Sequence, residues 1–141
     1  MIGIGCDQGG YLLKKEIIEF LEKKHIEYKD FGNDGEVGDY PDYAKAVCKE
    51  IQEGRCDKGI LICGTGIGIS IAANKMKGIR CALCADCFSA EATRLHNDAN
   101  VLALGGRVVG AGLAVKIIEI FLETDFSNEE RHIRRIQKIE E

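Results

Sequence analysis

The fold of this chain can be inferred from one stretch, Lys58-Gly59-Ile60-Leu61-Ile62-Cys63-Gly64-Thr65-Gly66-Ile67-Gly68-Ile69-Ser70. Its first part, residues 59–63, is a short apolar run of the kind that forms a parallel strand buried on both faces. Its second part carries three glycines at alternate positions and leads into residues 69–75, which can begin a helix. A thiol and a glycine-rich loop therefore follow a strand, at the edge where open α/β sheets bind their ligands.

The glycine loop has the composition of a reactive site. Glycines allow a sharp turn and let backbone N–H groups approach an anion or a developing oxyanion. Positive potential at such a loop favours a reactive thiolate at Cys63. The spacing matches neither the P-loop nor the G-x-G-x-x-G dinucleotide motif, so we do not expect a nucleotide site. The plainer alternative is a small buried cysteine followed by a tight turn.

Outward from this stretch, apolar runs alternate with segments of helical periodicity. The runs predict strands at residues 2–6, 26–31, 59–63, 79–84 and 100–104. The periodic segments predict helices at about 11–21, 41–53, 69–76, 88–96 and 112–122, and a charged terminal helix within 128–141. This order predicts an α/β protein with a three-layer α/β/α Rossmann-like fold and a five-stranded parallel sheet. We expect a single domain, residues 1–141, with a C-terminal helical arm at about 126–141.

The composition argues against several classes of protein. The chain has 141 residues, and 19 Lys and Arg against 23 Asp and Glu give a net charge of −4, unlike a general nucleic-acid or membrane-surface binder. Because no apolar stretch approaches membrane-spanning length and no signal peptide is visible, we expect a cytoplasmic protein. The seven cysteines are an odd number, so at least one thiol is free unless a bridge forms between chains.

Polar residues follow most of the expected strands, and the carboxyl ends of parallel strands meet at one edge of a sheet. These residues are Asp7, Cys63, Asp86 and Arg107. We expect His96 and Asn97, which close the fourth long helix, to join them there. Plainer roles are a helix cap for Asp7 and an interaction with the helix dipole for His96.

The terminal segment places Arg131 and Arg135 on one helical face by their i, i+4 spacing. Two guanidinium groups so placed can bind a phosphate, although a charge run is more often a solvated helix face. An arm that ends in arginines would make more sense if it reached over a neighbouring subunit.

The spacing of Cys81, Cys84 and Cys87 is that of some iron–sulfur ligands. Cys81 and Cys84 fall in an expected strand, where their side chains point to opposite faces, and a cluster or zinc ion would need a fourth ligand. We therefore interpret them as structural cysteines and expect no metal site.

Together these ordered motifs resemble the B-type ribose-5-phosphate isomerase family, which includes galactose-6-phosphate isomerase subunits, over nearly the whole chain. The motifs are Gly5-Cys6-Asp7-Gln8-Gly9-Gly10, Asp39-Tyr40-Pro41, residues 62–75, Gly78-Ile79-Arg80, His96-Asn97-Asp98-Ala99-Asn100-Val101 and Arg131-His132. The resemblance implies an isomerase that interconverts ribose 5-phosphate and ribulose 5-phosphate through an enediolate, without a cofactor. It also implies a homodimer or homotetramer whose sites are completed by two chains. An allose- or galactose-6-phosphate isomerase and a non-catalytic sugar-phosphate-binding module stay open as alternatives.

The resemblance further implies roles for individual residues. Cys63 is expected to move a proton between C1 and C2, Thr65 to assist at the substrate oxygens and His96 to open the furanose ring. The expected sugar contacts are Asp7, Tyr40, Gly64, Gly66, Ile67, Gly68 and Asn97, and Gln8 is a further expected substrate contact. The expected phosphate contacts are Arg107, Arg131 and Arg135.

Elementary chemistry agrees with these roles, because loop N–H groups can stabilise an enediolate and an imidazole suits proton exchange near neutral pH. Some family members use a loop Glu as the base, where this chain has Ile69, which favours Cys63. The family usually has His after the first-loop Asp, where this chain has Gln8. Gln can form hydrogen bonds but carries no charge, so we expect weaker phosphate binding or an altered substrate preference.

Overall fold

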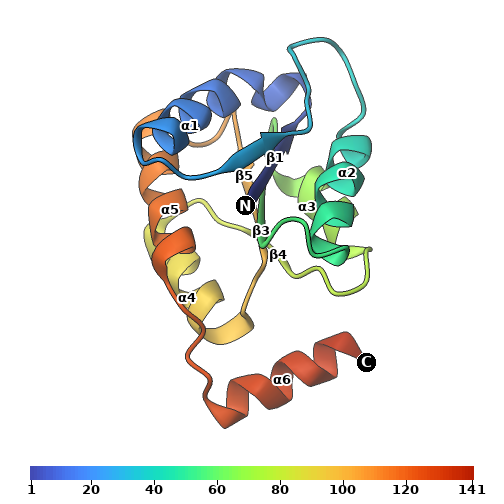
Figure 1. Ribbon diagram of the computed structural model, residues 1–141, viewed down its shortest axis with the longest axis vertical. Helices are drawn as coiled ribbons and strands as arrows, with labels where there is room; N and C mark the ends of the chain where they lie inside the picture. Colours follow the sequence, from blue (N-terminus) through green and yellow to red (C-terminus); the bar gives the residue numbers. More distant parts are fainter.

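A five-stranded parallel sheet with helices on both faces organises the computed structural model, which describes residues 1–141 (Figure 1). The strands are β1 (Ile2–Cys6), β2 (Tyr28–Asp30), β3 (Lys58–Cys63), β4 (Cys81–Leu83) and β5 (Val101–Gly105), in the order β2-β1-β3-β5-β4. The helices are α1 (Tyr11–Lys23), α2 (Tyr40–Gln52), α3 (Ile67–Asn74), α4 (Cys87–Asn97), α5 (Ala111–Glu123) and α6 (Glu130–Glu140). The predicted α/β/α architecture is thus confirmed.

The central strands are apolar because both of their faces are covered. Ile60 and Ile62 belong to a core packed beneath α1, α4 and α5, whereas Leu61 and Cys63 belong to a second core beneath α2 and α3. Successive side chains of a strand point to opposite faces, so a strand between two helical layers must be apolar throughout.

The order of the strands places two loops side by side. The chain leaves β1 towards one edge of the sheet and leaves β3 towards the other, so the connections diverge between these neighbours. Cys6 and Ile62 are partners in the ladder, which brings the residues that follow β1 next to the end of β3. Such a switch point is the usual ligand site of an open α/β sheet.

The two edge strands are shorter than the sequence predicts. β2 covers Tyr28–Asp30 rather than 26–31, and β4 covers Cys81–Leu83 rather than 79–84. At the start of β4, side-chain oxygens accept from backbone N–H groups. Asn100 Oδ1 accepts from Arg80, just before the strand, and Asn74 Oδ1 accepts from Cys81, its first residue.

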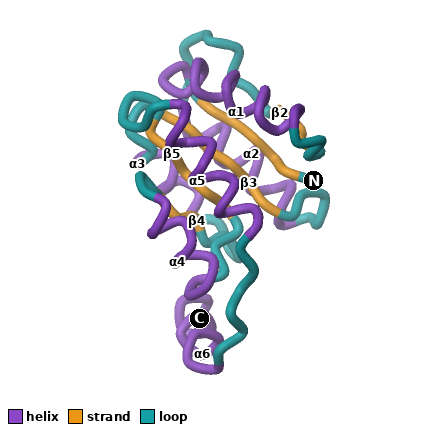
Figure 2. The backbone as a smooth tube through the Cα atoms, turned by 90° about the vertical axis from the view of Figure 1, so that its left-hand side faces the viewer, coloured by secondary structure: helices purple, strands orange, loops and turns teal.

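Helix α6 lies apart from the sheet, below the end of α4 (Figures 1 and 2). The connection that leads to it is fixed by the buried Arg94, whose Nε donates to the carbonyl of Thr124 at 3.0 Å. No helix in the chain has the length and apolar character needed to cross a membrane.

Candidate active site

An open pocket of about 380 Å³ lies at the carboxyl ends of β1 and β3. It is lined by Asp7, Tyr40, Cys63, Gly64, Thr65, Ile67 and Gly68. We call these seven residues the carboxyl-edge cluster. All of them are site residues predicted from the sequence. They come from the loop after β1, from the start of α2, and from the stretch that runs from the end of β3 into the first turn of α3.

Cys63 ends β3 with 5% of its surface exposed, and its sulfur accepts a hydrogen bond from the N–H of Gly66 at 3.1 Å. Gly66 is the N-cap of α3, so the sulfur also lies at the positive end of a helix dipole. Cys63 also lines the pocket at the carboxyl edge, so a ligand there can reach its thiol.

Two glycines allow the loop to close around this thiol. Gly66 has a φ of 80°, and an added Cβ would lie 2.8 Å from the carbonyl carbon of Leu104. At Gly68 an added Cβ would lie 2.6 Å from Cζ of Tyr40, so the tyrosine ring packs directly on the glycine. The left-handed backbone at one position and the close approach of a ring at the other both require glycine.

Thr65 and Asp7 each retain capacity for a ligand. Thr65 Oγ1 accepts a hydrogen bond from the N–H of Ile67 at 3.2 Å, which leaves its hydroxyl proton free to be donated. Asp7 Oδ1 accepts from the N–H of Gly9 at 2.9 Å and caps a short 3₁₀ turn at Gln8–Gly10 that the sequence did not predict. The capping role is thus confirmed for Asp7. Because a carboxylate has two oxygens, Oδ2 stays available to a ligand.

Gln8 and Arg107 lie at the margin of the cluster. Gln8 Oε1 accepts from the N–H of Gly38 at 3.0 Å, which leaves its amide nitrogen as the group able to donate elsewhere. The backbone N–H of Arg107 donates to the carbonyl of Gly64 at 2.9 Å, and its guanidinium lies beside the same glycine.

His96 and Asn97 do not join this cluster, so the prediction that they share the carboxyl edge was wrong. Helix α4 begins after the carboxyl end of β4 and ends shortly before β5 begins. It therefore returns the chain across the sheet, and its last residues lie at the amino edge (Figure 1). In a parallel sheet, residues just before a strand lie at the amino edge, whereas residues just after a strand lie at the carboxyl edge.

A second group of predicted residues assembles at the amino edge. We call His96, Asn97, Arg131 and Arg135 the amino-edge cluster. The His96 ring stacks on that of His132 in α6, with centroids 4.6 Å apart and an angle of 18° between the planes. Both arginines are exposed on α6.

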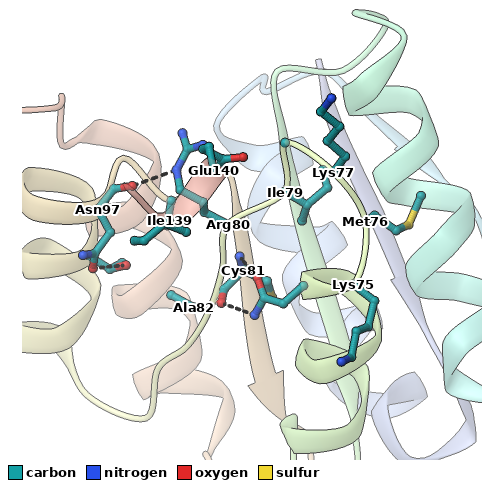
Figure 3. Close-up of a pocket in the computed structure, with 14 residues that line it drawn as sticks. Lys75, Met76, Lys77, Ile79, Arg80, Cys81, Ala82, Asn97, Ile139 and Glu140 are labelled. Carbon is teal, nitrogen blue, oxygen red and sulfur yellow. Dashed lines mark hydrogen bonds and ion pairs between the residues drawn. The ribbon is translucent and has the colours of Figure 1, made fainter. Parts of the chain in front are cut away.

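Arg80 ties α6 to the end of α4. Its Nε donates to the carbonyl of Asn97 at 2.9 Å, and its Nη1 pairs with Glu140 Oε1 at 2.8 Å (Figure 3). Its Nη2 donates to the carbonyl of Asp98. Sequence reasoning assigned no role to Arg80 or His132, although both stand in the quoted motifs Gly78-Ile79-Arg80 and Arg131-His132.

Cys81 and Cys84, two of the cysteines with the C-x2-C-x2-C spacing, point to opposite faces of the sheet, as predicted. Cys81 packs against the core beneath α2 and α3, and Cys84 belongs to the core on the other face of the sheet. No three His, Cys, Asp or Glu side chains are placed to hold a metal ion.

Comparison with known proteins agrees with the geometry. Residues 2–139 match the family model described as Ribose/Galactose Isomerase. The chain is 47% identical over 139 residues to ribose-5-phosphate isomerase B of Escherichia coli, covering 98% of this chain and 93% of that protein. The solved structure of ribose-5-phosphate isomerase B from Clostridium thermocellum matches with a TM-score of 0.96 and 52% identity, over 99% of this chain and 94% of that one. A protein of Pectobacterium atrosepticum named D-erythrulose-4-phosphate isomerase is 44% identical over 127 residues, 89% of this chain and 84% of that protein.

Proposed function

The chain belongs to the ribose/galactose isomerase family, and from this premise we propose that it interconverts ribose 5-phosphate and ribulose 5-phosphate. It is an aldose–ketose isomerase. The observation that carries the proposal is the position of Cys63, whose sulfur faces the N–H of Gly66 within a pocket that Asp7 and Tyr40 also line.

The chemistry starts from the open-chain sugar. Cys63, as a thiolate, removes the proton on C2 of ribose 5-phosphate, and the electron pair moves into the C1–C2 bond and onto O1 to give an enediolate. Backbone N–H groups of the glycine loop donate to the developing negative charge, a kind of stabilisation worth about 3 kcal/mol per well-placed donor. Return of the proton from sulfur to C1, with transfer of the O2 hydroxyl proton to O1, completes ribulose 5-phosphate.

Thr65, Asp7 and Tyr40 act on the sugar in this proposal. The free hydroxyl proton of Thr65 is donated to a substrate oxygen as charge develops there. Asp7 and Tyr40 contact the sugar hydroxyls, since both line the pocket around the thiol. The other contacts that we propose are with Gln8, Gly64, Gly66, Ile67, Gly68 and Asn97.

A second copy of the chain completes each site. The proposed site needs both clusters in one cavity, because His96 opens the ring and Arg131 and Arg135 bind the phosphate together with Arg107. Within one chain, however, the two clusters lie at opposite edges of the sheet. A dimer with a two-fold axis meets this requirement, because the carboxyl-edge cluster of each protomer then faces the amino-edge cluster of its partner, which gives two composite sites. Apolar side chains exposed on α3, at the end of β4, at the start of α4 and after β5 support such an interface. They are Ile67, Ile71, Leu83, Phe88 and Val108.

A six-carbon or four-carbon sugar phosphate is the alternative substrate. Gln8 stands where the family usually has His, and the Pectobacterium relative carries the name of a four-carbon isomerase. Ketose formation from ribose 5-phosphate, allose 6-phosphate, galactose 6-phosphate and erythrose 4-phosphate decides the question. We expect the highest kcat/KM for ribose 5-phosphate, and a clear preference for another sugar would replace the pentose in the proposal.

Cys63→Ala tests the assigned base. We expect this variant to lose nearly all exchange of the C2 proton with solvent while it still binds the sugar phosphate. Cys56→Ser is the matched control, because Cys56 is also buried but precedes β3 at the amino edge. Near-normal turnover of Cys63→Ala would assign the base role to another residue.

A further inference from the structure

His132 is the only buried residue of α6, with 5% of its surface exposed on a helix whose other side chains are exposed or half-buried. Its ring lies on that of His96 with centroids 4.6 Å apart and nearly parallel planes. Aromatic rings at this separation attract each other beyond the effect of buried area alone. The docking of α6 near its N-terminus therefore depends on contact between two imidazoles.

The His132 ring presents a neutral face to His96. Burial lowers the pKa of His132. The nearby Arg131, His96 and Arg135 lower it further, and Glu129 acts in the opposite direction. Nε2 of His132 is buried without a hydrogen-bond partner, and the nearest carboxylate oxygen, Glu129 Oε2, is 3.9 Å away. The ring is thus packed as an aromatic surface and is not held by a polar contact at Nε2.

His96 needs such support, because it is exposed near the end of α4. An exposed imidazole can change rotamer, whereas ring opening needs its nitrogen in line with the anomeric hydroxyl or the ring oxygen. Misplacement by about 1 Å can cost about 100-fold in rate. A ring stacked on the imidazole restricts its plane and leaves the nitrogens at its edge free.

We propose that His132 is a positioning residue that fixes the plane of the His96 imidazole and joins it to the helix that carries Arg131 and Arg135. The Arg80–Glu140 ion pair holds the other end of the same helix to the backbone after His96. The ring-opening group and the phosphate ligands therefore keep a fixed spacing. This inference rests on the proposed function, since the spacing matters only for a cyclic sugar phosphate.

The test compares His132→Phe, which keeps an aromatic face, with His132→Leu, which does not. Each variant is assayed on ribose 5-phosphate, which cyclises, and on D-erythrose 4-phosphate, which cannot close to a furanose because its O4 carries the phosphate. We expect His132→Leu to lose about tenfold in kcat on the pentose, the effect of one aromatic pair, and less than about threefold on the four-carbon sugar. His132→Phe should stay within about threefold of the parent on both.

Glu140→Gln serves as the matched control, because it loosens the other end of α6 without touching His96. It should raise KM for ribose 5-phosphate and leave kcat nearly unchanged. Equal losses of His132→Leu on the two sugars would overturn the proposal, as would a phenylalanine variant as impaired as the leucine one. In the second case a ring nitrogen of His132 would be the active feature.

An NMR measurement separates this inference from the proposed function. The stack predicts a ring-current shift of the His96 ring protons that persists in His132→Phe and is lost in His132→Leu. If the parent protein isomerises no sugar phosphate, the proposed function fails, and the NMR comparison still decides whether His132 orients His96. Unchanged His96 signals in both variants would refute the positioning role.

Discussion

The contact between Tyr40 and Gly68 gives a sharp way to perturb the carboxyl-edge cluster. A Cβ added at Gly68 would lie 2.6 Å from Cζ, 2.7 Å from Cε1 and 2.9 Å from Oη of Tyr40. Because carbon atoms in contact are about 3.5–4.0 Å apart, the ring must move by about 1 Å in Gly68→Ala. Tyr40 is 39% exposed, so it can swing towards solvent without disturbing the core.

The two effects of Gly68→Ala should therefore differ in size. We expect the free energy of unfolding to change by less than about 1 kcal/mol, because the displaced ring meets water rather than packed side chains. We expect kcat/KM for ribose 5-phosphate to fall by about 100-fold, the scale of a displacement of about 1 Å in a catalytic site. Steady-state kinetics and denaturant unfolding measure the two quantities.

Two further variants isolate the cause. Gly112→Ala is the matched control, because its added Cβ would meet no atom within 4 Å beyond the adjoining backbone of α5, and activity should be unchanged. In a Tyr40→Ala background, Gly68→Ala should cause little further loss, since the colliding ring is already absent. Full activity of Gly68→Ala, or the same 100-fold loss without Tyr40, would refute the reasoning.

Two other predictions concern the amino-edge cluster. Co-expressed Cys63→Ala and Arg135→Ala chains should regain about a quarter of parental activity. About half of the dimers are then mixed, and each mixed dimer has one intact composite site out of two. Mixed dimers without activity would place Arg135 in its own chain's site or on a solvated face. Because burial lowers the pKa of His132, its contribution to the docking of α6 is present above the ordinary histidine pKa of about 6.5 and is lost as pH falls through the lower folded-state value. Hydrogen exchange in residues 130–140, corrected for the intrinsic rate, should therefore accelerate below about pH 6.5 in the parent. The groups that face the ring are His96, Glu129, Arg131 and Arg135, and an equal pH effect in His132→Phe would contradict the assignment to His132.

The sequence was most informative where a residue type follows directly from its surroundings. Strands buried on both faces must be apolar, so β1, β3 and β5 were predicted to within one residue at each end. The edge strands were not. At β4, Asn100 and Asn74 accept hydrogen bonds from the N–H groups of Arg80 and Cys81, and periodicity does not reveal such contacts. The residues that follow β1 and β3 were correctly grouped, since parallel strands bring their carboxyl ends together.

The prediction for His96 was wrong because the direction of α4 was not considered, and the correct position of His96 has a consequence for oligomer assembly. Helix α4 has 11 residues and so is about 16 Å long, and it begins at the carboxyl edge where Cys63 lies. Proton transfer needs heavy atoms about 3 Å apart, a separation that no side-chain rotamer of one chain supplies across the height of the sheet. If His96 opens the ring of a sugar bound at Cys63, it must therefore come from another copy of the chain. Isolated protomers should then bind an open-chain sugar phosphate weakly and should not isomerise a cyclic one, so turnover per chain should fall on dilution as the dimer dissociates.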